Sequence, residues 1–289
     1  MVLARIAAHS VNTVKFAPLA VSILLAFVSP SPAHALDCAK ASSSVDKLIC
    51  ATPELKKADQ DMVVAYFKLL GETTDPDFHE ALIKSQRRWL KVRSFGPDRF
   101  GLAENDRTDD REVLLGMTRA RLTFMQTGKP IRVMEQERQI MSKDSGSRFA
   151  GFKTDCVLQP PPYGSWNYEC WGDAHRQQNG RICSSLMRWA SGRYYEYRLV
   201  SVLSADTPKF VAFCSAQNDT MDARCPESDI ISETHWSGVP NWPDLPTWRA
   251  ADLWKYDPDI DPQVIDQKWI NDCLISSVYP PPEANHPKE

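Results

Sequence analysis

Side chains that could do hydrolytic or metal chemistry occur in this chain, but their spacing supports neither. Ser232 lies three residues before His235, an arrangement that is common by chance, and no nucleophile-elbow, metalloprotease or phosphate-binding glycine motif accompanies it. No two histidines have the three- or four-residue spacing by which one helix face binds a metal. The sequence therefore predicts no catalytic residue, no metal site and no cofactor. The histidines beyond residue 35 are His79, His175, His235 and His286.

Acids alternate from Asp257 to Pro262 as they do at the start of a calcium-binding loop. The pattern fails at two positions, because Pro262 stands where the loop requires glycine and Lys268 where it requires a bidentate glutamate. We interpret this segment as a solvated loop.

Tryptophans recur at six-residue intervals among prolines near the C-terminus, at Trp236, Trp242, Trp248 and Trp254. Their flat faces could stack on sugar rings, which would make the C-terminal region a glycan-binding module. They could equally fill the core of a small domain with few strands. We prefer the core interpretation and keep the glycan-binding module as an alternative.

Residues 1–35 have the pattern of a secretory signal peptide. A basic, acid-free beginning is followed by the apolar run Phe16–Val28, and Ala33-His34-Ala35 places small residues before a cleavage site at Leu36. The apolar run is too short to span a bilayer comfortably, so we expect no stable membrane insertion after cleavage. We expect the mature chain in the periplasm or outside the cell.

The composition is globular, with 43% hydrophobic and 25% charged residues among 289. The net charge is −3, and it becomes −5 when the signal peptide with its two basic residues is removed. Such a chain lacks the basic face that nucleic acid requires as a partner. An even number of cysteines in an exported chain predicts disulfides. All eight lie beyond residue 35: Cys38, Cys50, Cys156, Cys170, Cys183, Cys214, Cys225 and Cys273.

Pairing of the cysteines between residues 156 and 273 is constrained by two turns. A proline-rich turn centred on Tyr163 sets Cys156 opposite Cys170 in a hairpin, within disulfide reach. The Asn179-Gly180 turn sets Cys183 opposite Arg176, which disfavours a Cys170–Cys183 bond. We therefore predict Cys156–Cys170. For the other four we favour Cys183–Cys273 and Cys214–Cys225, among the 15 connectivities that six cysteines allow.

Helical patterns fill residues 36–128. Thr52-Pro53 and Asp75-Pro76 each combine a cap with a proline in the first turn, and a third helix begins near Thr108–Asp110 and runs to Gly128. Amphipathic helices joined by short loops predict an antiparallel helical bundle.

The pattern changes after residue 128. Residues 129–147 are interpreted as a linker, and residues 148–289 as a Cys- and Trp-rich, β-containing domain. Strands are expected at Tyr194–Leu203 and Phe210–Phe213, and one helix from Asp261 to Leu274. The predicted fold class is α+β: an antiparallel helical bundle followed by a disulfide-stapled, β-containing C-terminal domain.

A family resemblance rests on three blocks of the helical half. They are Asp37-Cys38-Ala39-Lys40-Ala41 with Val45-Asp46-Lys47-Leu48-Ile49-Cys50, Pro53-Glu54-Leu55 with Asp59 and Tyr66, and Gln86-Arg87-Arg88-Trp89-Leu90-Lys91-Val92-Arg93. Together these blocks resemble the N-terminal domain of LprI-type lysozyme inhibitors over about residues 36–125. The resemblance implies an inhibitor of lysozyme or a related muramidase that does no catalysis.

The family signature falls on Asp59, Tyr66, Gln86, Trp89 and Arg93. We expect Trp89 to pack in the core, and Asp59, Gln86 and Arg93 to form a structural polar network between the helices. Cys38 and Cys50 are expected to tie the N-terminal segment to the first short helix.

The sequence departs from the family at a second cysteine pair, whose positions hold Gly96 and Val113. The loop between the second and third helices should therefore be less restrained than in the typical member. Ser94–Asp110 carries a local charge of −3, and animal lysozymes are typically basic, so this loop is our candidate contact. The partner-binding residues are hypothesised to be Phe95, Asp98, Phe100, Glu104 and Asp106. The alternatives are the glycan-binding module and, least favoured, an enzyme of another class.

Overall fold

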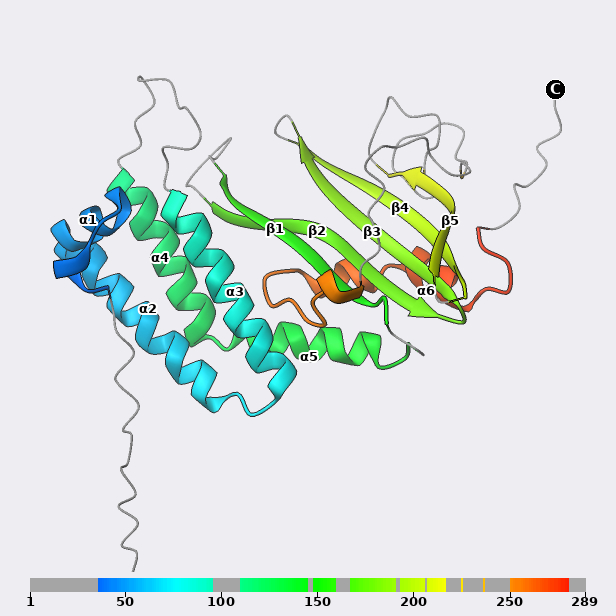
Figure 1. Ribbon diagram of the computed structural model, residues 1–289, viewed down its shortest axis with the longest axis horizontal. Helices are drawn as coiled ribbons and strands as arrows, with labels where there is room; N and C mark the ends of the chain where they lie inside the picture. Colours follow the sequence, from blue (N-terminus) through cyan, green and yellow to red (C-terminus); the bar gives the residue numbers. More distant parts are fainter. Residues whose placement is uncertain are drawn as a thin grey trace, which may run out of the picture. The chain divides into compact units, whose positions relative to one another are not determined.

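The structure is a computed structural model of the 289-residue chain. It describes residues 36–95, 110–144, 148–159, 167–190, 193–205, 207–216, 225, 236 and 250–280. Five helices precede a five-stranded antiparallel sheet, which confirms the α+β class (Figure 1). The predicted signal peptide, residues 1–35, lies outside the described residues. Among the helices of the described part, none has the length and apolar character needed to cross a membrane.

The helices begin where local capping signals predict. The carboxylate of Asp75 accepts hydrogen bonds from the backbone N–H groups of Asp77 (3.0 Å) and Phe78 (3.1 Å), which satisfies donors that the first turn of α3 leaves unpaired. Thr52 is the N-cap of α2, whose first residue is Pro53. The N-terminal helices are α1 (Ser44–Ala51), α2 (Pro53–Glu72), α3 (Pro76–Phe95), α4 (Asp110–Gln126) and α5 (Lys129–Met141).

Helix α5 occupies most of the segment expected to be a linker. Gly128 adopts φ of 64°, and Pro130 lies in the first turn of α5. The buried positions Pro130, Val133, Glu137 and Ile140 then follow at three- and four-residue spacing, so one face of α5 is buried. Residues 129–141 are thus a packed helix rather than an extended connection. The division of the chain into two domains stays a prediction.

The strands form a simple meander in sequence order, β1 to β5. Asn179 and Gly180 both have positive φ, 52° and 72°, and join β2 to β3 in the predicted two-residue hairpin. The two strands expected from composition are present as β4 and β5. The bounds are β1 (Gly151–Gln159), β2 (Asn167–Gln178), β3 (Arg181–Ala190), β4 (Arg193–Ser204) and β5 (Thr207–Ser215).

All eight cysteines are in disulfides. Cys156 and Cys170 are directly opposed in the β1–β2 register, as predicted from a turn centred on Tyr163. The favoured pairings of the other cysteines are confirmed as well. The bonds are Cys38–Cys50, Cys156–Cys170, Cys183–Cys273 and Cys214–Cys225.

The C-terminal segment differs from the single helix that was expected. Asp261 does act as a cap, accepting from the backbone N–H of Gln263 at 2.9 Å, but the turn it begins is the short 3-10 helix η4 (Pro262–Ile265). The helix α6 (Lys268–Ile275) starts anew after a break at Asp266 and Gln267. A further 3-10 turn, η3 (Ala250–Asp252), precedes them.

The segment after η3 pairs with the edge of the sheet. Trp254 exchanges backbone hydrogen bonds with Phe152 of β1, at 2.8 and 2.7 Å. Gly151 permits this approach, because a Cβ at that position would lie 2.4 Å from the Trp254 carbonyl oxygen. In Figure 1 this segment, in orange, runs beside β1. The residues that follow it therefore start from a fixed point on the sheet.

Candidate functional site

An ion pair between Asp59 of α2 and Arg93 of α3 joins the first two long helices. The side chain of Asp59 is 4% exposed and that of Arg93 12% exposed. The Arg93 guanidinium also lies 5.2 Å from the ring centre of Trp89, whose side chain is fully buried among the core residues Met62 and Met117. The expected core role of Trp89 is confirmed, as is the contact between Asp59 and Arg93.

Gln86 takes a different partner from the one expected. Its Oε1 accepts a hydrogen bond from Nε of Arg121 on α4 at 3.1 Å, while Nη2 of the same guanidinium donates to Ser85 Oγ at 2.7 Å. Gln86 thus holds a buried arginine in place rather than bridging Asp59 and Arg93. Tyr66, the remaining signature residue, is half-buried on α2, and burial raises its pKa against the opposing fields of Arg87 and Arg121.

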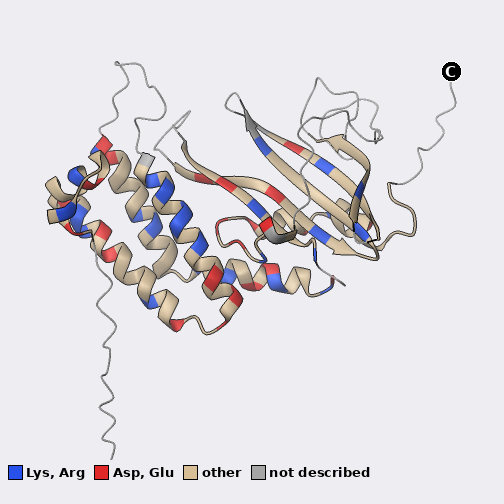
Figure 2. Ribbon diagram, in the orientation of Figure 1, with Lys and Arg blue, Asp and Glu red and all other residues tan. Residues whose placement is uncertain are grey.

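A second set of ion pairs reaches from these helices to the C-terminal segment. Arg88 of α3 donates to both carboxylate oxygens of Asp257, at 2.6 and 2.8 Å, and to Asp259 at 2.6 Å. Arg121 of α4 donates to the other oxygen of Asp259 at 2.8 Å. Figure 2 shows basic positions along α3 and acidic positions on the segment beside β1. We call Arg88, Arg121, Glu137, Asp257 and Asp259 the interhelix charge cluster.

The interpretation of Asp257–Pro262 as a solvated loop is wrong. Asp257 is fully buried, and Pro258, Ile260 and Pro262 are buried with it. Asp257 and Asp259 are paired because two buried guanidiniums face them, and Ile260 packs in a core cluster with Ile140 of α5 and Phe152 of β1. Asp261 is exposed. Nothing in the local sequence marks these acids as buried, since their partners lie 138 to 171 positions away.

Glu137 of α5 completes the interhelix charge cluster. Its Oε2 accepts the backbone N–H of Asp257 at 3.0 Å, whereas its buried Oε1 has no hydrogen-bond partner among the described residues. Burial raises the pKa of Glu137 to about 10; the Asp257 N–H opposes this shift, and the carboxylates of Asp257 and Asp259 add to it. With Glu137 protonated, two guanidinium charges balance two carboxylate charges.

The partners of the cluster shift in the complementary direction. Burial by itself raises the pKa of Asp259, but Arg121 and Arg88 outweigh it and hold this pKa below its usual range. Burial likewise acts to lower the pKa of Arg88, and the carboxylates of Asp257 and Asp259 raise it well above its usual value. Groups held in this way keep their charge at neutral pH, so the cluster is built to hold segments together rather than to transfer protons.

The sulfurs of Cys156 and Cys170 lie near a carboxylate oxygen of Asp259, a grouping that by position alone could hold a metal ion. Both sulfurs are committed to the disulfide, so neither offers the thiolate that a metal needs.

Another buried arginine, Arg176 of β2, joins three elements that sequence reasoning did not connect. It donates to Asp144 after α5 at 2.6 Å and to Asn271 of α6 at 2.7 Å. The neighbouring His175 is fully buried, its Nδ1 lies 2.8 Å from Ser184 Oγ, and burial lowers its pKa to about 4. Arg176 and His175 are thus both buried and bonded to other protein groups.

Residues 38–123 match the model of the family described as Lysozyme inhibitor LprI. Residues 38–123 are an LprI domain. Comparison with curated proteins and with solved structures gave no match.

The LprI domain spans α1, α2, α3 and most of α4, with the Cys38–Cys50 disulfide at its start. It contains Arg88 and Arg121, but their acidic partners Asp257 and Asp259 lie outside it. Val113, which stands at one position of the lost cysteine pair, is buried in the core of the LprI domain.

The hypothesised partner-binding loop of the LprI domain falls largely outside the described residues. Phe95 is the last residue of α3, and Asp98, Phe100, Glu104 and Asp106 lie in the part that is not described. Ser232, His235 and His286 also lie outside the described residues, and His79 is half-buried on α3. The partner-binding residues therefore stay a prediction.

The described tryptophans of the C-terminal region pack against protein rather than forming an open stacking face. Trp269 of α6 is 5% exposed. Trp254 has the Arg88 guanidinium 4.4 Å from its ring centre, and Trp236 lies 6.3 Å from the ring of Trp269. Trp242 and Trp248 lie outside the described residues. The described residues thus support the core interpretation for Trp269, Trp254 and Trp236.

Proposed function

We propose that this chain binds and inhibits lysozyme, or a related muramidase, through its LprI domain and without catalysis of its own. The observation that carries the proposal is the family match over residues 38–123, whose family is named for lysozyme inhibition. The disulfides support a place in an oxidising compartment, the periplasm or the cell exterior, where lysozyme acts on the cell wall.

The proposed contact is the acidic loop that joins α3 to α4. Lysozyme cleaves glycan with two carboxylates in an open cleft, so an inhibitor needs only to fill that cleft or cover its rim. Asp98, Glu104 and Asp106 would steer the loop toward a basic lysozyme, and Phe95 and Phe100 would supply apolar contact area. The helices on either side fix both ends of the loop.

A binding experiment with the full mature chain tests this proposal. Association of the chain with immobilised basic lysozyme is measured at low and high salt, together with residual lysozyme activity. Replacing Asp98, Glu104 and Asp106 by serine is expected to slow association by about tenfold at low salt, and the difference should shrink at high salt.

The matched control replaces three exposed acids elsewhere, Glu72, Glu135 and Asp252, by serine as well, so both triple variants lose the same three negative charges. If the two triple variants slow association to the same extent, net charge rather than the loop guides binding. If the intact chain neither binds nor inhibits any lysozyme of a panel, the inhibitor function is refuted. Capture of the chain by insoluble peptidoglycan in place of lysozyme would favour the glycan-binding alternative.

A further inference from the structure

An open pocket of about 470 Å³ lies where the end of α5, the residues before β1 and the segment after η3 meet. Three basic side chains line it: Arg138 in the last turn of α5, Arg148 just before β1, and Lys255 after η3. Among the described residues of its wall there is no carboxylate. We call it the basic pocket. Every residue that lines it lies beyond residue 123, outside the LprI domain.

The positive charge of the basic pocket is only partly neutralised. Arg138 is paired with Asp75 at 2.5 Å and Lys255 with Asp77 at 2.5 Å, and neither acid lines the pocket. Arg148 is exposed, and it forms no ion pair or hydrogen bond with any residue that the structure describes. Two acids shared among three cations thus leave the charge of Arg148 for a ligand to meet.

The two paired cations also have hydrogen-bond donors to spare. Arg138 uses Nη2 for Asp75 and Nε for the Tyr256 hydroxyl, at 3.4 Å, and its Nη1 makes no hydrogen bond to the described residues. Lys255 uses one of its three N–H donors for Asp77. This hydrogen bond raises the pKa of Lys255 against burial and the charge of Arg138, so the ammonium stays charged at neutral pH. Such donors suit the oxygen atoms of an anion.

Two of the three cations are held in place before any ligand binds. The Arg138 guanidinium lies 4.0 Å from the ring centre of Phe78, and this ring packs edge-on against Tyr256 at 5.1 Å. Lys255 directly follows Trp254, whose backbone is hydrogen-bonded to β1. Groups that are already positioned lose less conformational freedom on binding, which favours affinity.

The rest of the wall is apolar and within reach of water. Met141 of α5, Ala150, Ala250 of η3 and Leu253 line the basic pocket, and each is half-buried. Covering such surface favours binding by about 25 cal/mol per Å². A volume of about 470 Å³ falls within the range of roughly 300–1,000 Å³ that is usual for small-molecule sites. An anion that carries a short apolar chain would therefore gain from both parts of the wall.

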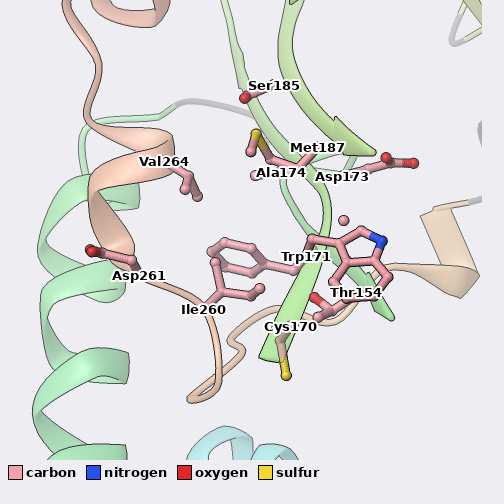
Figure 3. A pocket seen from close by; sticks show the side chains of 12 residues that line it. Thr154, Cys170, Trp171, Asp173, Ala174, Ser185, Met187, Ile260, Asp261 and Val264 are labelled. Carbon is pink, nitrogen blue, oxygen red and sulfur yellow. The ribbon is translucent and has the colours of Figure 1, made fainter. Parts of the chain in front are cut away.

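Two other hollows differ from the basic pocket in charge. A cavity of about 190 Å³ lies beside Gly172, with Ile260 and Val264 on one side and Ala174 and Met187 on the other (Figure 3). Its described wall is mostly apolar and includes no basic side chain. A larger hollow of about 1010 Å³, between α4, α5 and β2, carries both acids and bases. Neither combines positive charge with an acid-free wall.

We infer that the basic pocket, lined by Arg138, Arg148, Lys255, Met141 and Leu253, binds a small amphipathic anion: a carboxylate or phosphate group on a short hydrocarbon chain. The anionic oxygens accept hydrogen bonds from Arg148 and from the spare donors of Arg138 and Lys255. The chain lies against Met141 and Leu253. This site is separate from the lysozyme contact, so its failure would leave the proposed inhibitor function standing.

Hexanoate and hexyl phosphate are the probes, with 1-hexanol as the uncharged probe of the same chain and acetate as the head group alone. Affinities for the full mature chain are measured by titration calorimetry, and the methyl NMR signals of Met141 and Leu253 locate the ligand. At least one of the two anions should bind saturably and shift both signals, and the tighter anion identifies the head group. Hexanol and acetate should each bind at least about tenfold more weakly, because each meets only one part of the wall.

Arg148→Gln is the decisive variant, because Arg148 has no ion pair or hydrogen bond within the described residues whose loss would disturb the fold. It should weaken the tighter anion about tenfold, as loss of a charge-assisted hydrogen bond predicts, and leave hexanol within about twofold. Arg87→Gln is the matched control, since Arg87 is exposed on α3 away from the pocket wall and the change removes the same charge. This control should bind the anion within about twofold of the unchanged chain.

Three results would overturn the proposal. The first is the absence of saturable binding by either anion at millimolar concentration. The second is hexanol binding as tightly as the anions, which would leave the cations without a role. The third is an equal loss of affinity in Arg148→Gln and Arg87→Gln, which would mean that net charge rather than the basic pocket attracts the anion.

Discussion

Two regions join the long helices by buried ion pairs, and they differ in where the partners lie along the chain. Asp59 and Arg93 are 34 residues apart, both within the LprI domain. In the interhelix charge cluster, Arg88 and Arg121 belong to the LprI domain, while Asp257 and Asp259 come from near the C-terminus. The first pair is internal to the domain, whereas the second makes the domain depend on the rest of the chain.

The two regions also differ in how their charges are satisfied. The Arg93 side chain remains 12% exposed at the last turn of α3, so water reaches one side of its pair. Arg121 and Asp259 are each 3% exposed, and each charged group in the cluster is paired with a buried group of opposite charge. An LprI domain built this way folds best with the C-terminal segment in place, because that segment neutralises its buried arginines. A test of function therefore requires a chain that includes the C-terminal segment.

The largest effect is expected from Asp259→Asn, which removes the carboxylate that Arg88 and Arg121 share. Loss of one partner from a buried ion pair leaves an uncompensated charge, so the free energy of unfolding should fall by about 3–5 kcal/mol. Denaturant unfolding at pH 7 measures this change. The control is Asp261→Asn, two residues along, where asparagine caps η4 as well as aspartate does and little should change. A loss below about 1 kcal/mol in Asp259→Asn would show that Arg88 and Arg121 do not depend on the Asp259 carboxylate to balance their charge.

Glu137→Gln should change how stability depends on pH. In the folded chain the pKa of Glu137 is about 10, against an ordinary value of 4.5, so between these values unfolding releases a proton. Stability contributed by the protonated form is complete below pH 4.5 and falls as pH rises toward 10, by at most about 1.4 kcal/mol per pH unit. Glutamine has the shape of the protonated glutamic acid and cannot ionise, so it should flatten this dependence of the free energy of unfolding on pH. Unfolding free energies measured from pH 5 to pH 9 give the comparison.

The double variant sharpens the test, because Glu137 can offset the loss of Asp259. With Asp259 neutralised, ionisation of Glu137 would restore the balance against Arg88 and Arg121. Adding Glu137→Gln to Asp259→Asn removes that rescue, so the double variant should lose more stability than the two single variants together. Additive losses would mean that Glu137 does not titrate with the cluster.

His175→Asn should produce the opposite dependence on pH, in the sheet. The folded pKa of His175 is about 4, below its ordinary 6.5, so the unfolded chain binds a proton between these values and the folded chain does not. Stability contributed by neutral His175 is complete above pH 6.5 and is lost as pH falls toward 4. Asparagine retains a polar partner for Ser184 and should flatten the acid side of the profile. The charged neighbours that act on His175 are Asp173, Arg188 and Lys153.

Local rules predicted much of this architecture. The Asn179-Gly180 turn fixed the register of β2 and β3, and the arithmetic around Tyr163 placed Cys156 opposite Cys170. Such inferences succeed because a turn and a period of two determine which residues face each other. Helix α5 could also have been found, because Pro130 in its first turn and apolar positions at helical spacing are both in the sequence.

Long-range pairing could not be predicted in the same way. Asp257 and Asp259 flank Pro258, and Pro262 follows shortly after; a polar, proline-containing segment of this kind is typical of solvated loops. Their burial follows from arginines more than 130 residues earlier, which a local pattern does not reveal. The cavity beside Gly172 has the same origin, since Phe152, Met187 and Val264 come from separate elements. Where three or more distant segments meet, a local sequence pattern does not show which residues face each other.

The smallest effect is expected from Asp59→Asn, which tests the pair internal to the LprI domain. Asparagine still accepts a hydrogen bond from Arg93, and the guanidinium can reach water at the end of α3, so the loss should be about 1–2 kcal/mol. Asp61→Asn on the same helix is the matched control. Asp61 is 45% exposed and 2.8 Å from Lys57, a surface pair that contributes about 0.5 kcal/mol or less. In urea unfolding, the loss in free energy of unfolding should be largest for Asp259→Asn, smaller for Asp59→Asn and smallest for Asp61→Asn. Suppose instead that Asp59→Asn lowers the free energy of unfolding as much as Asp259→Asn does. The loss would then depend on the burial of the ion pair and not on how far apart its partners lie in the sequence. The LprI domain would depend on its own ion pair as strongly as on the C-terminal segment.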